Sequence, residues 1–230
     1  MYRIVCTLVV LLFWPAVSRA VDSHLIYLNN CKPNGCLLHS GSDNAVTHTS
    51  SIPDTQSTLT AFAYSDETFG RTASCLRGVF ARYDVSITTV EPGILPRREM
   101  MIAGQPENVG LQSGIRGVSP FSGEPIDNAI AFAFANTSGD DPDLLCWTAA
   151  MQLGHLYGLD HAHYCPDLMS YLDQCGVKSF TDFDAPCGEF SDRTCASGAA
   201  TQNSDATLRL VIGDVDRIFF ASFDPEMPTS

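Results

Sequence analysis

The chain has 230 residues, of which 45% are hydrophobic, enough for one good-sized domain or two small ones. Its 26 acidic residues outnumber its 13 basic residues, and the net charge is −13 at pH 7. A protein of this charge lacks the basic surface that neutralises phosphates, so the composition argues against nucleic-acid binding.

The first 20 residues have the pattern of a secretory signal peptide. Arg3 precedes the apolar segment 4–17, and Ser18 and Ala20 are small residues where a signal peptidase would cleave. The apolar segment is too short for a stable membrane span, although an uncleaved anchor is the alternative. We therefore expect a signal peptide at 1–20 and a secreted or periplasmic protein with no membrane span after cleavage.

Residues 24–29 predict a short strand, while the polar segment 39–60 predicts a surface loop or flexible connection. Four further elements follow from apolar spacing: a helix over 68–83, a strand over 85–90, strand and loops over 94–127 and a strand over 128–135. In the last of these, large apolar residues alternate with alanines, which suits a strand whose two faces meet different packing demands.

A second long helix is predicted over 143–157. Asp141 and Pro142 form a favourable helix start, and Gly158 ends the helix because it adopts a left-handed conformation without a Cβ penalty. One face of this helix is uniformly apolar, whereas the other carries Met151 and His155.

Eight cysteines remain after the predicted cleavage, and an even number is typical of a disulfide framework in an exported protein. Pairing of sequence neighbours predicts the disulfides Cys31–Cys36, Cys165–Cys175 and Cys187–Cys195, with Cys75–Cys146 as a long-range link. Other connectivities stay open. A zinc ribbon is disfavoured because the chain has no C-x-x-C pair.

Two features outside these elements bear on processing and on the C-terminal region. Asn136-Thr137-Ser138 is an N-glycosylation sequon, relevant only if the source glycosylates exported proteins. Residues 172–200 hold three cysteines and many small polar residues, which predicts a disulfide-stapled loop region.

The segment 148–161, TAAMQLGHLYGLDH, resembles the metzincin zinc motif H-E-x-x-H-x-x-G-x-x-H. In that motif three histidines bind zinc, and the glutamate takes a proton from the zinc-bound water. His155 and His161 match the second and third histidines. Residues 165–171, CPDLMSY, resemble the Met-turn of the same family, which places Met169 beneath the metal and Tyr171 near the substrate.

Two positions depart from the motif. Met151 replaces the first histidine, and a thioether suits Cu(I) better than zinc. Gln152 replaces the general-base glutamate, and an amide does not accept a proton at neutral pH. General-base catalysis commonly contributes ~10²–10⁴ in rate, so the two substitutions predict impaired hydrolysis.

Whether the site binds a metal, and which one, stays open at this point. The ordinary alternative for Met151 is core packing rather than ligation. His155 and His161 are expected to hold zinc weakly or not at all, with His163, Asp160 or water completing the shell. A copper site formed by Met151 and the two histidines is a less favoured alternative.

The resemblance implies an α+β, metzincin-like zincin fold, with a twisted mixed sheet, two long helices, a cleft along an edge strand and a small disulfide-stapled C-terminal subdomain. This domain is expected over 21–212, with a tail at 213–230. The function implied is that of a secreted, catalytically impaired metzincin homologue that binds peptide or protein in the cleft as a monomer. An active zinc endopeptidase with an atypical metal site and a disulfide-stapled extracellular interaction module are the alternatives.

Overall fold

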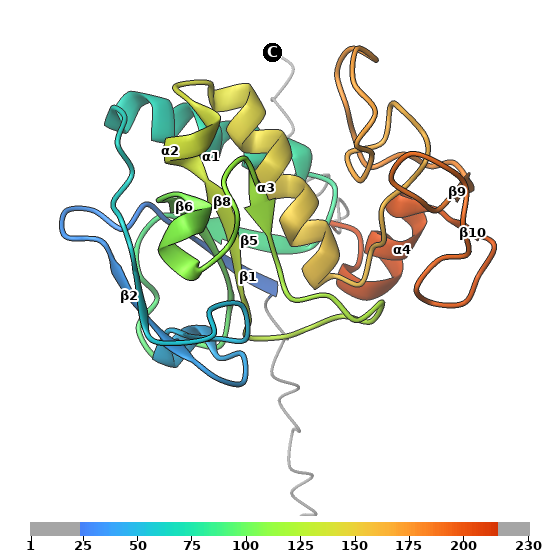
Figure 1. Ribbon diagram of the computed structural model, residues 1–230. Helices are drawn as coiled ribbons and strands as arrows, with labels where there is room; N and C mark the ends of the chain where they lie inside the picture. The colour runs from blue at the N-terminus through green and yellow to red at the C-terminus, as the bar shows by residue number, and fades with distance from the viewer. Residues whose placement is uncertain (1–23, 216–230) are drawn as a thin grey trace, which may run out of the picture.

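The computed structural model describes residues 24–215, so the predicted signal peptide and most of the predicted tail lie outside the described residues. The fold is mixed α+β (Figure 1). Its main sheet has the order β5-β1-β6-β8-β7, in which β7 alone is antiparallel. The strands are β1 (His24–Asn29), β5 (Val85–Thr88), β6 (Arg98–Ala103), β7 (Gly117–Val118) and β8 (Ile130–Phe134).

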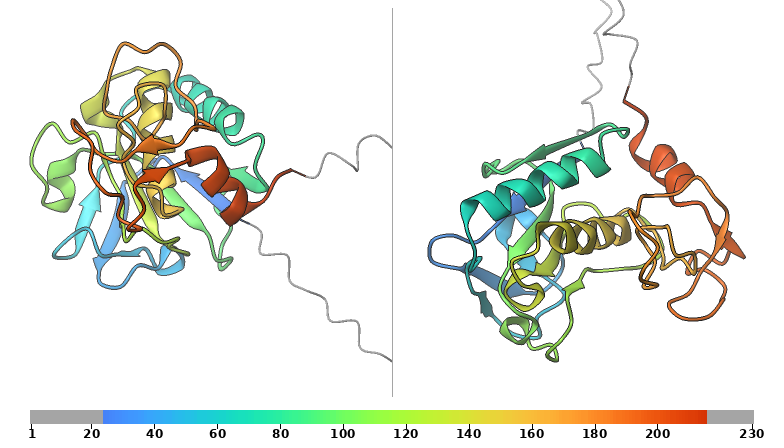
Figure 2. Two further views of the ribbon diagram at one scale, coloured as in Figure 1. Left: turned by 90° about the vertical axis from the view of Figure 1, so that its right-hand side faces the viewer. Right: turned by 90° about the horizontal axis from the view of Figure 1, so that it is seen from above.

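Two helices, α1 (Asp66–Val79) and α3 (Pro142–Leu156), lie side by side on one face of this sheet (Figure 2). Helix α1 begins two residues before the predicted start because Ser65 caps it, accepting a hydrogen bond from the Thr68 amide. Asp141 caps α3 in the same way, as the sequence predicts. The Cys75–Cys146 disulfide joins the two helices.

The opposite face of the main sheet is covered by small elements. They are β2 (Cys36–Ser40), η1 (Ala45–Thr47), β3 (Thr49–Ser50), β4 (Ser57–Leu59) and η2 (Pro106–Val109). The prediction of a loop over 39–60 is therefore wrong: its residues contribute to a three-stranded sheet ordered β3-β2-β4. Polar residues dominate this segment because only one side of the small sheet faces the core.

Strand β8 is buried on both faces, and the residues on each face suit the layer that packs against it. Ala131 and Ala133 face the helices, where small side chains permit close packing, whereas Phe132 and Phe134 fill the space beneath the small sheet. The prediction of two different packing environments for this strand is confirmed.

The chain after α3 forms a loop-rich C-terminal subdomain, which is orange to red in Figure 1. It contains β9 (Ala185–Pro186), β10 (Thr201–Gln202) and α4 (Ser204–Ile212), the last of which sequence reasoning missed. All four predicted disulfides are present. Within residues 24–215, no helix is long and apolar enough to span a membrane.

The sequon asparagine, Asn136, has a structural role in the short helix α2 (Ala135–Ser138). Its Nδ2 donates to the Ala61 carbonyl at 3.0 Å, and its Oδ1 accepts from the Ala63 amide at 3.0 Å. The amide therefore ties the chain before α1 to the end of β8, and the nitrogen that would carry a glycan is already bonded.

We predict that Asn136→Ala lowers the free energy of unfolding by about 1–3 kcal/mol, because it leaves the Ala61 carbonyl and Ala63 amide without partners. Thr137→Ala, at the exposed neighbouring position, is the matched control and should change it by less than about 0.5 kcal/mol. Urea denaturation of both variants measures the difference, and equal stabilities would contradict the role of the Asn136 side chain.

Candidate functional site

The two motif histidines meet because the chain reverses directly after α3. Gly158 has a φ of +88°, in the left-handed region, and a Cβ there would lie 3.0 Å from the Glu124 carbonyl carbon. The turn brings His161 back to His155, and their ring centroids are 4.6 Å apart at 85°. The structure therefore brings together the two histidines that the motif predicts.

Each histidine is oriented by a backbone carbonyl. The Nδ1 atom of His155 lies 2.8 Å from the Leu159 carbonyl oxygen, and Nδ1 of His161 lies 3.3 Å from that of Met169. Because a carbonyl only accepts, Nδ1 carries the proton in the neutral ring, and Nε2 keeps its lone pair. Such carbonyl contacts are the usual means of orienting histidines that bind metals.

Burial keeps both imidazoles neutral. Burial, together with the neighbouring His161, lowers the pKa of His155 from its ordinary value of 6.5 to about 4. Burial is also the main cause that lowers the pKa of His161. At neutral pH the pair therefore presents two uncharged nitrogen donors.

The residues that precede His155 on α3 supply no third metal ligand of the type usual for zinc. Met151 lies one turn earlier on α3, is half-buried, and packs against the main core. Gln152 is 5% exposed and approaches the edge strand: a Cβ on Gly117 would lie 2.9 Å from its Cγ.

The residues proposed to complete a metal shell are engaged elsewhere. His163 pairs with Asp192 through Nδ1 at 2.5 Å, and the Asp160 carboxylate is held by Arg193. Among the described residues, no group of three or more His, Cys, Asp or Glu side chains is placed to bind a metal ion. A catalytic zinc centre has three protein ligands, and this donor set of two histidines and a thioether does not fit one.

The turn that contains Met169 packs against α3 at Gly154, and its Met169 carbonyl contacts His161. Met169 is fully buried, and a Cβ on Gly154 would lie only 2.5 Å from its Sδ, so this close approach requires glycine on α3. The buried Asp167 carboxylate fixes the turn by accepting from the Met169 amide at 2.8 Å and the Thr181 amide at 3.0 Å. Burial raises the pKa of Asp167, although these hydrogen bonds act against it.

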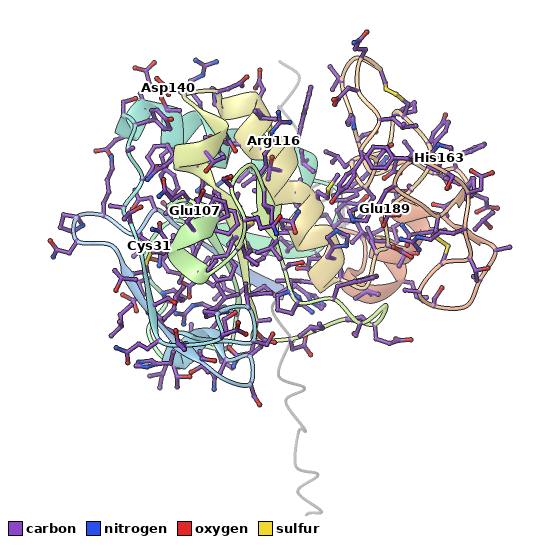
Figure 3. All side chains as sticks on the ribbon, viewed as in Figure 1. Cys31, Glu107, Arg116, Asp140, His163 and Glu189 are labelled. Carbon is purple, nitrogen blue, oxygen red and sulfur yellow. A yellow bond between two sulfur atoms is a disulfide. The ribbon has the colours of Figure 1, made fainter. Side chains whose placement is uncertain are left out.

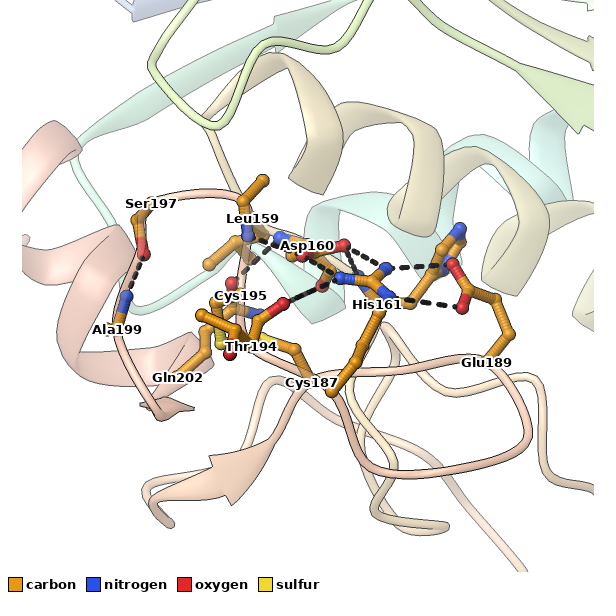
Figure 4. A network of polar contacts seen from close by, with 12 residues as sticks. Leu159, Asp160, His161, Cys187, Glu189, Thr194, Cys195, Ser197, Ala199 and Gln202 are labelled. Atoms are coloured by element: carbon orange, nitrogen blue, oxygen red, sulfur yellow. Dashed lines mark hydrogen bonds and ion pairs between the residues drawn. A yellow bond between two sulfur atoms is a disulfide. The ribbon is translucent and has the colours of Figure 1, made fainter.

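A network centred on Asp160 joins the turn after α3 to the C-terminal loops (Figure 4). The Asp160 carboxylate receives two hydrogen bonds from Arg193, at 2.6 and 2.8 Å, one from the His161 amide at 2.7 Å and one from the Ala196 amide at 2.8 Å. Arg193 also pairs with Glu189 at 2.8 Å. Sequence reasoning missed Arg193, because nothing in the local pattern marks it as the partner of Asp160.

A cavity of about 530 Å³ lies between edge strand β7 and α3; Met151 and Gln152 line it, whereas His155 and His161 do not. Its apolar wall includes Leu144, Trp147, Met151 and Ile115, and its far side includes Tyr171 and Phe190. Figure 3 shows Arg116, another lining residue, over α3, with Glu189 on the facing C-terminal subdomain. The cavity is therefore bounded by both parts of the chain.

Aromatic rings flank the histidine pair on both sides, and two of them also line this cavity. The His161 ring contacts Tyr171 at 4.3 Å between centroids, and Tyr171 contacts Phe190 at 5.9 Å. On the other side, Phe121 contacts His155 at 5.1 Å. Tyr171 was predicted to lie near a substrate, whereas Phe121 and Phe190 come from loops whose sequences do not indicate where they fold.

No model of a known protein family matches the chain, and no curated protein matches it.

We predict that Arg193→Gln lowers the free energy of unfolding by about 1–3 kcal/mol, since it leaves the buried Asp160 carboxylate without its charged partner. Arg116→Gln is the control, because Arg116 is exposed and has no ion-pair partner among the described residues. Guanidinium denaturation measures both, and an equal loss in the two variants would contradict the network.

The same variant changes the pH dependence of stability. Burial alone raises the pKa of Asp160, but hydrogen bonds from Arg193, Ala196 and His161 outweigh it and hold the pKa below its ordinary value of 3.8. The stability contributed by Asp160 is therefore present above pH 3.8 and is lost as the pH falls below that value. Arg193→Gln removes the largest of these hydrogen-bond contributions and so raises the pKa of Asp160 in the folded state, and we expect the loss of stability below pH 3.8 to be smaller in this variant than in the wild type.

Proposed function

We propose that the chain is a secreted, metzincin-like pseudo-protease that binds peptides in the cleft between β7 and α3. The observation that carries the proposal is a metzincin-type histidine pair, oriented and neutral, that lacks both a third ligand and a carboxylate base. Beside it lies a cavity of about 530 Å³, open to an edge strand.

The arrangement of the elements supports the family assignment. The resemblance implies a twisted mixed sheet, two long helices and a Met-containing turn beneath the motif. The chain has a mixed sheet in which β7 alone is antiparallel, with α1 and α3 on one face. The close contact between Gly154 and Met169 supports it further, because it places the turn directly under the motif helix.

The chemistry of the site argues against hydrolysis. The Gln152 amide does not take a proton from water at neutral pH, and Met151 offers zinc only a soft thioether. We propose that any zinc held by His155 and His161 is held weakly, since two histidines fall short of the three ligands that retain zinc in catalytic sites.

Peptide binding by strand addition fits the cleft. Strand β7 pairs only with β8 in the main sheet, so its outer edge is available to the main chain of an extended peptide. The neighbouring cavity has a largely apolar wall, which suits an apolar side chain of the peptide. Exposed rings of Tyr171 and Phe190 extend this apolar surface toward the C-terminal subdomain.

Trp147 makes peptide binding directly measurable, since it lines the cleft and is the only tryptophan in residues 24–215. We predict a saturable change in its fluorescence on titration with a random library of tryptophan-free nonapeptides. Phe190→Ala should weaken binding about tenfold, which corresponds to about 1.4 kcal/mol.

Leu210→Ala is the control, because Leu210 is also a highly exposed apolar residue but lies on α4 and does not line the cavity. It should bind the library as the wild type does. Absence of a saturable change in Trp147 fluorescence, or equally weakened binding in Phe190→Ala and Leu210→Ala, would contradict the peptide-binding proposal.

The metal proposal has its own test. We predict that dialysis removes added zinc from the wild type, whereas Met151→His combined with Gln152→Glu retains about one zinc per chain and gains some proteolysis. Gln152→Glu alone is the control, since it restores the carboxylate without the ligand. Stoichiometric zinc and cleavage of a protein substrate by the wild type would favour an active endopeptidase instead.

A further inference from the structure

This acidic chain engages most of its basic side chains in ion pairs. Of its 13 lysines and arginines, all but Arg3, Arg19 and Arg217 lie within residues 24–215. Six of these pair with a carboxylate: Lys32, Arg82, Arg97, Arg98, Arg193 and Arg209. The others have no carboxylate within ion-pair distance among the described residues, and two of them, Arg116 and Lys178, line the cavity of about 530 Å³ in the cleft.

Lys178 is a half-buried cation on the far wall of this cavity. Its Nζ donates at 2.6 Å to the Ser170 carbonyl, which is a neutral acceptor. Burial lowers the pKa of Lys178, and the charges of Asp173 and Asp167 act against this effect. An ammonium group has three donors, so Lys178 has two left for an anion, which is a stronger acceptor than a carbonyl.

Arg116 approaches the cavity from the edge of the sheet. It directly precedes β7, and its carbonyl accepts from the Phe134 amide at 2.7 Å, which fixes the main chain at this point. The side chain is exposed and lies over α3 (Figure 3). Its guanidinium is therefore accessible to a ligand that enters between β7 and α3.

Positive charge outweighs negative charge around the cavity, although the chain as a whole has a net charge of −13. Asp173 is the acidic residue among those that line it, and it is not within ion-pair distance of Arg116 or Lys178. Glu189 on the C-terminal subdomain is paired with Arg193. The walls of the cavity are thus complementary to a negatively charged group.

We propose that the cleft selects peptides that carry an acidic side chain, aspartate or glutamate. The carboxylate of this side chain accepts hydrogen bonds from the Lys178 ammonium and the Arg116 guanidinium, while the rest of the peptide lies along β7. This inference rests on the proposed function, peptide binding in the cleft, and names the class of peptide.

Three libraries of tryptophan-free nonapeptides test the proposal. Each has a fixed central residue, glutamate, glutamine or lysine, and uncharged residues elsewhere, and binding is followed through Trp147 fluorescence. We expect the glutamate library to bind about tenfold more tightly than the glutamine library, because only the carboxylate forms charged hydrogen bonds. The lysine library should bind most weakly.

Two features of this design separate local contacts from general electrostatics. The net charge of −13 repels an acidic peptide at long range, so a preference for glutamate reports contacts in the cleft. Raising the salt concentration from about 0.05 M to about 0.5 M should reduce that preference, because ions screen charges that are open to solvent.

Lys178→Gln and Arg116→Gln should each lower the preference for glutamate over glutamine from about tenfold to about threefold, since each removes one of the two charged partners. Arg71→Gln is the matched control: Arg71 is exposed on α1, has no ion-pair partner among the described residues and does not line the cavity. Its preference should equal that of the wild type. Because Arg116 is exposed, its variant tests the proposal even if Lys178→Gln is destabilised.

The outcomes distinguish this inference from the proposed function. Equal binding of the glutamate and glutamine libraries, or an unchanged preference in Lys178→Gln and Arg116→Gln, would overturn the selectivity and leave peptide binding in place. Absence of saturable binding for all three libraries would overturn both.

Discussion

The buried carboxylate of Asp160 is the constraint on which the C-terminal subdomain depends. A charged group out of water must be paired and hydrogen-bonded, and Asp160 meets this requirement with Arg193 and two backbone amides. Those partners come from the turn after α3 and from a loop more than 30 residues later. One ionised group therefore sets both the approach of His161 and the position of the loop that carries Glu189.

A second constraint acts through shape rather than charge. Gly154 and Gly158 let α3 approach the Met169 turn and the chain near Glu124 more closely than any other residue would. Because of this, the C-terminal end of α3, which carries His155, is held against the Met169 turn and the chain near Glu124.

The sequence predicts best the features that depend on neighbouring residues. Strand β1, helix α3 with its Asp141 cap, and the short-range disulfides all follow from local patterns, and all are confirmed. The meeting of His155 and His161 was also predictable, because the motif encodes a helix and a turn of fixed length.

Features that depend on distant partners were not predictable in the same way. The small sheet within 36–59 has too few apolar residues to show a strand period, and α4 is a single short helix without a strong apolar run. No local sequence pattern indicates the contacts made by Arg193, Phe121 and Phe190. Their contacts form only when the loops that carry them fold onto the C-terminal end of α3 and the turn after it.

The carbonyl contacts of the two histidines have an evolutionary consequence. Because the Leu159 and Met169 carbonyls hold the two imidazole rings, the orientation of the rings depends on the backbone of the turns after α3 and not on the side chain at position 151. Under the proposed family assignment, the substitutions at the adjacent positions Met151 and Gln152 in α3 separate the chain from the full motif and leave these two carbonyl contacts in place.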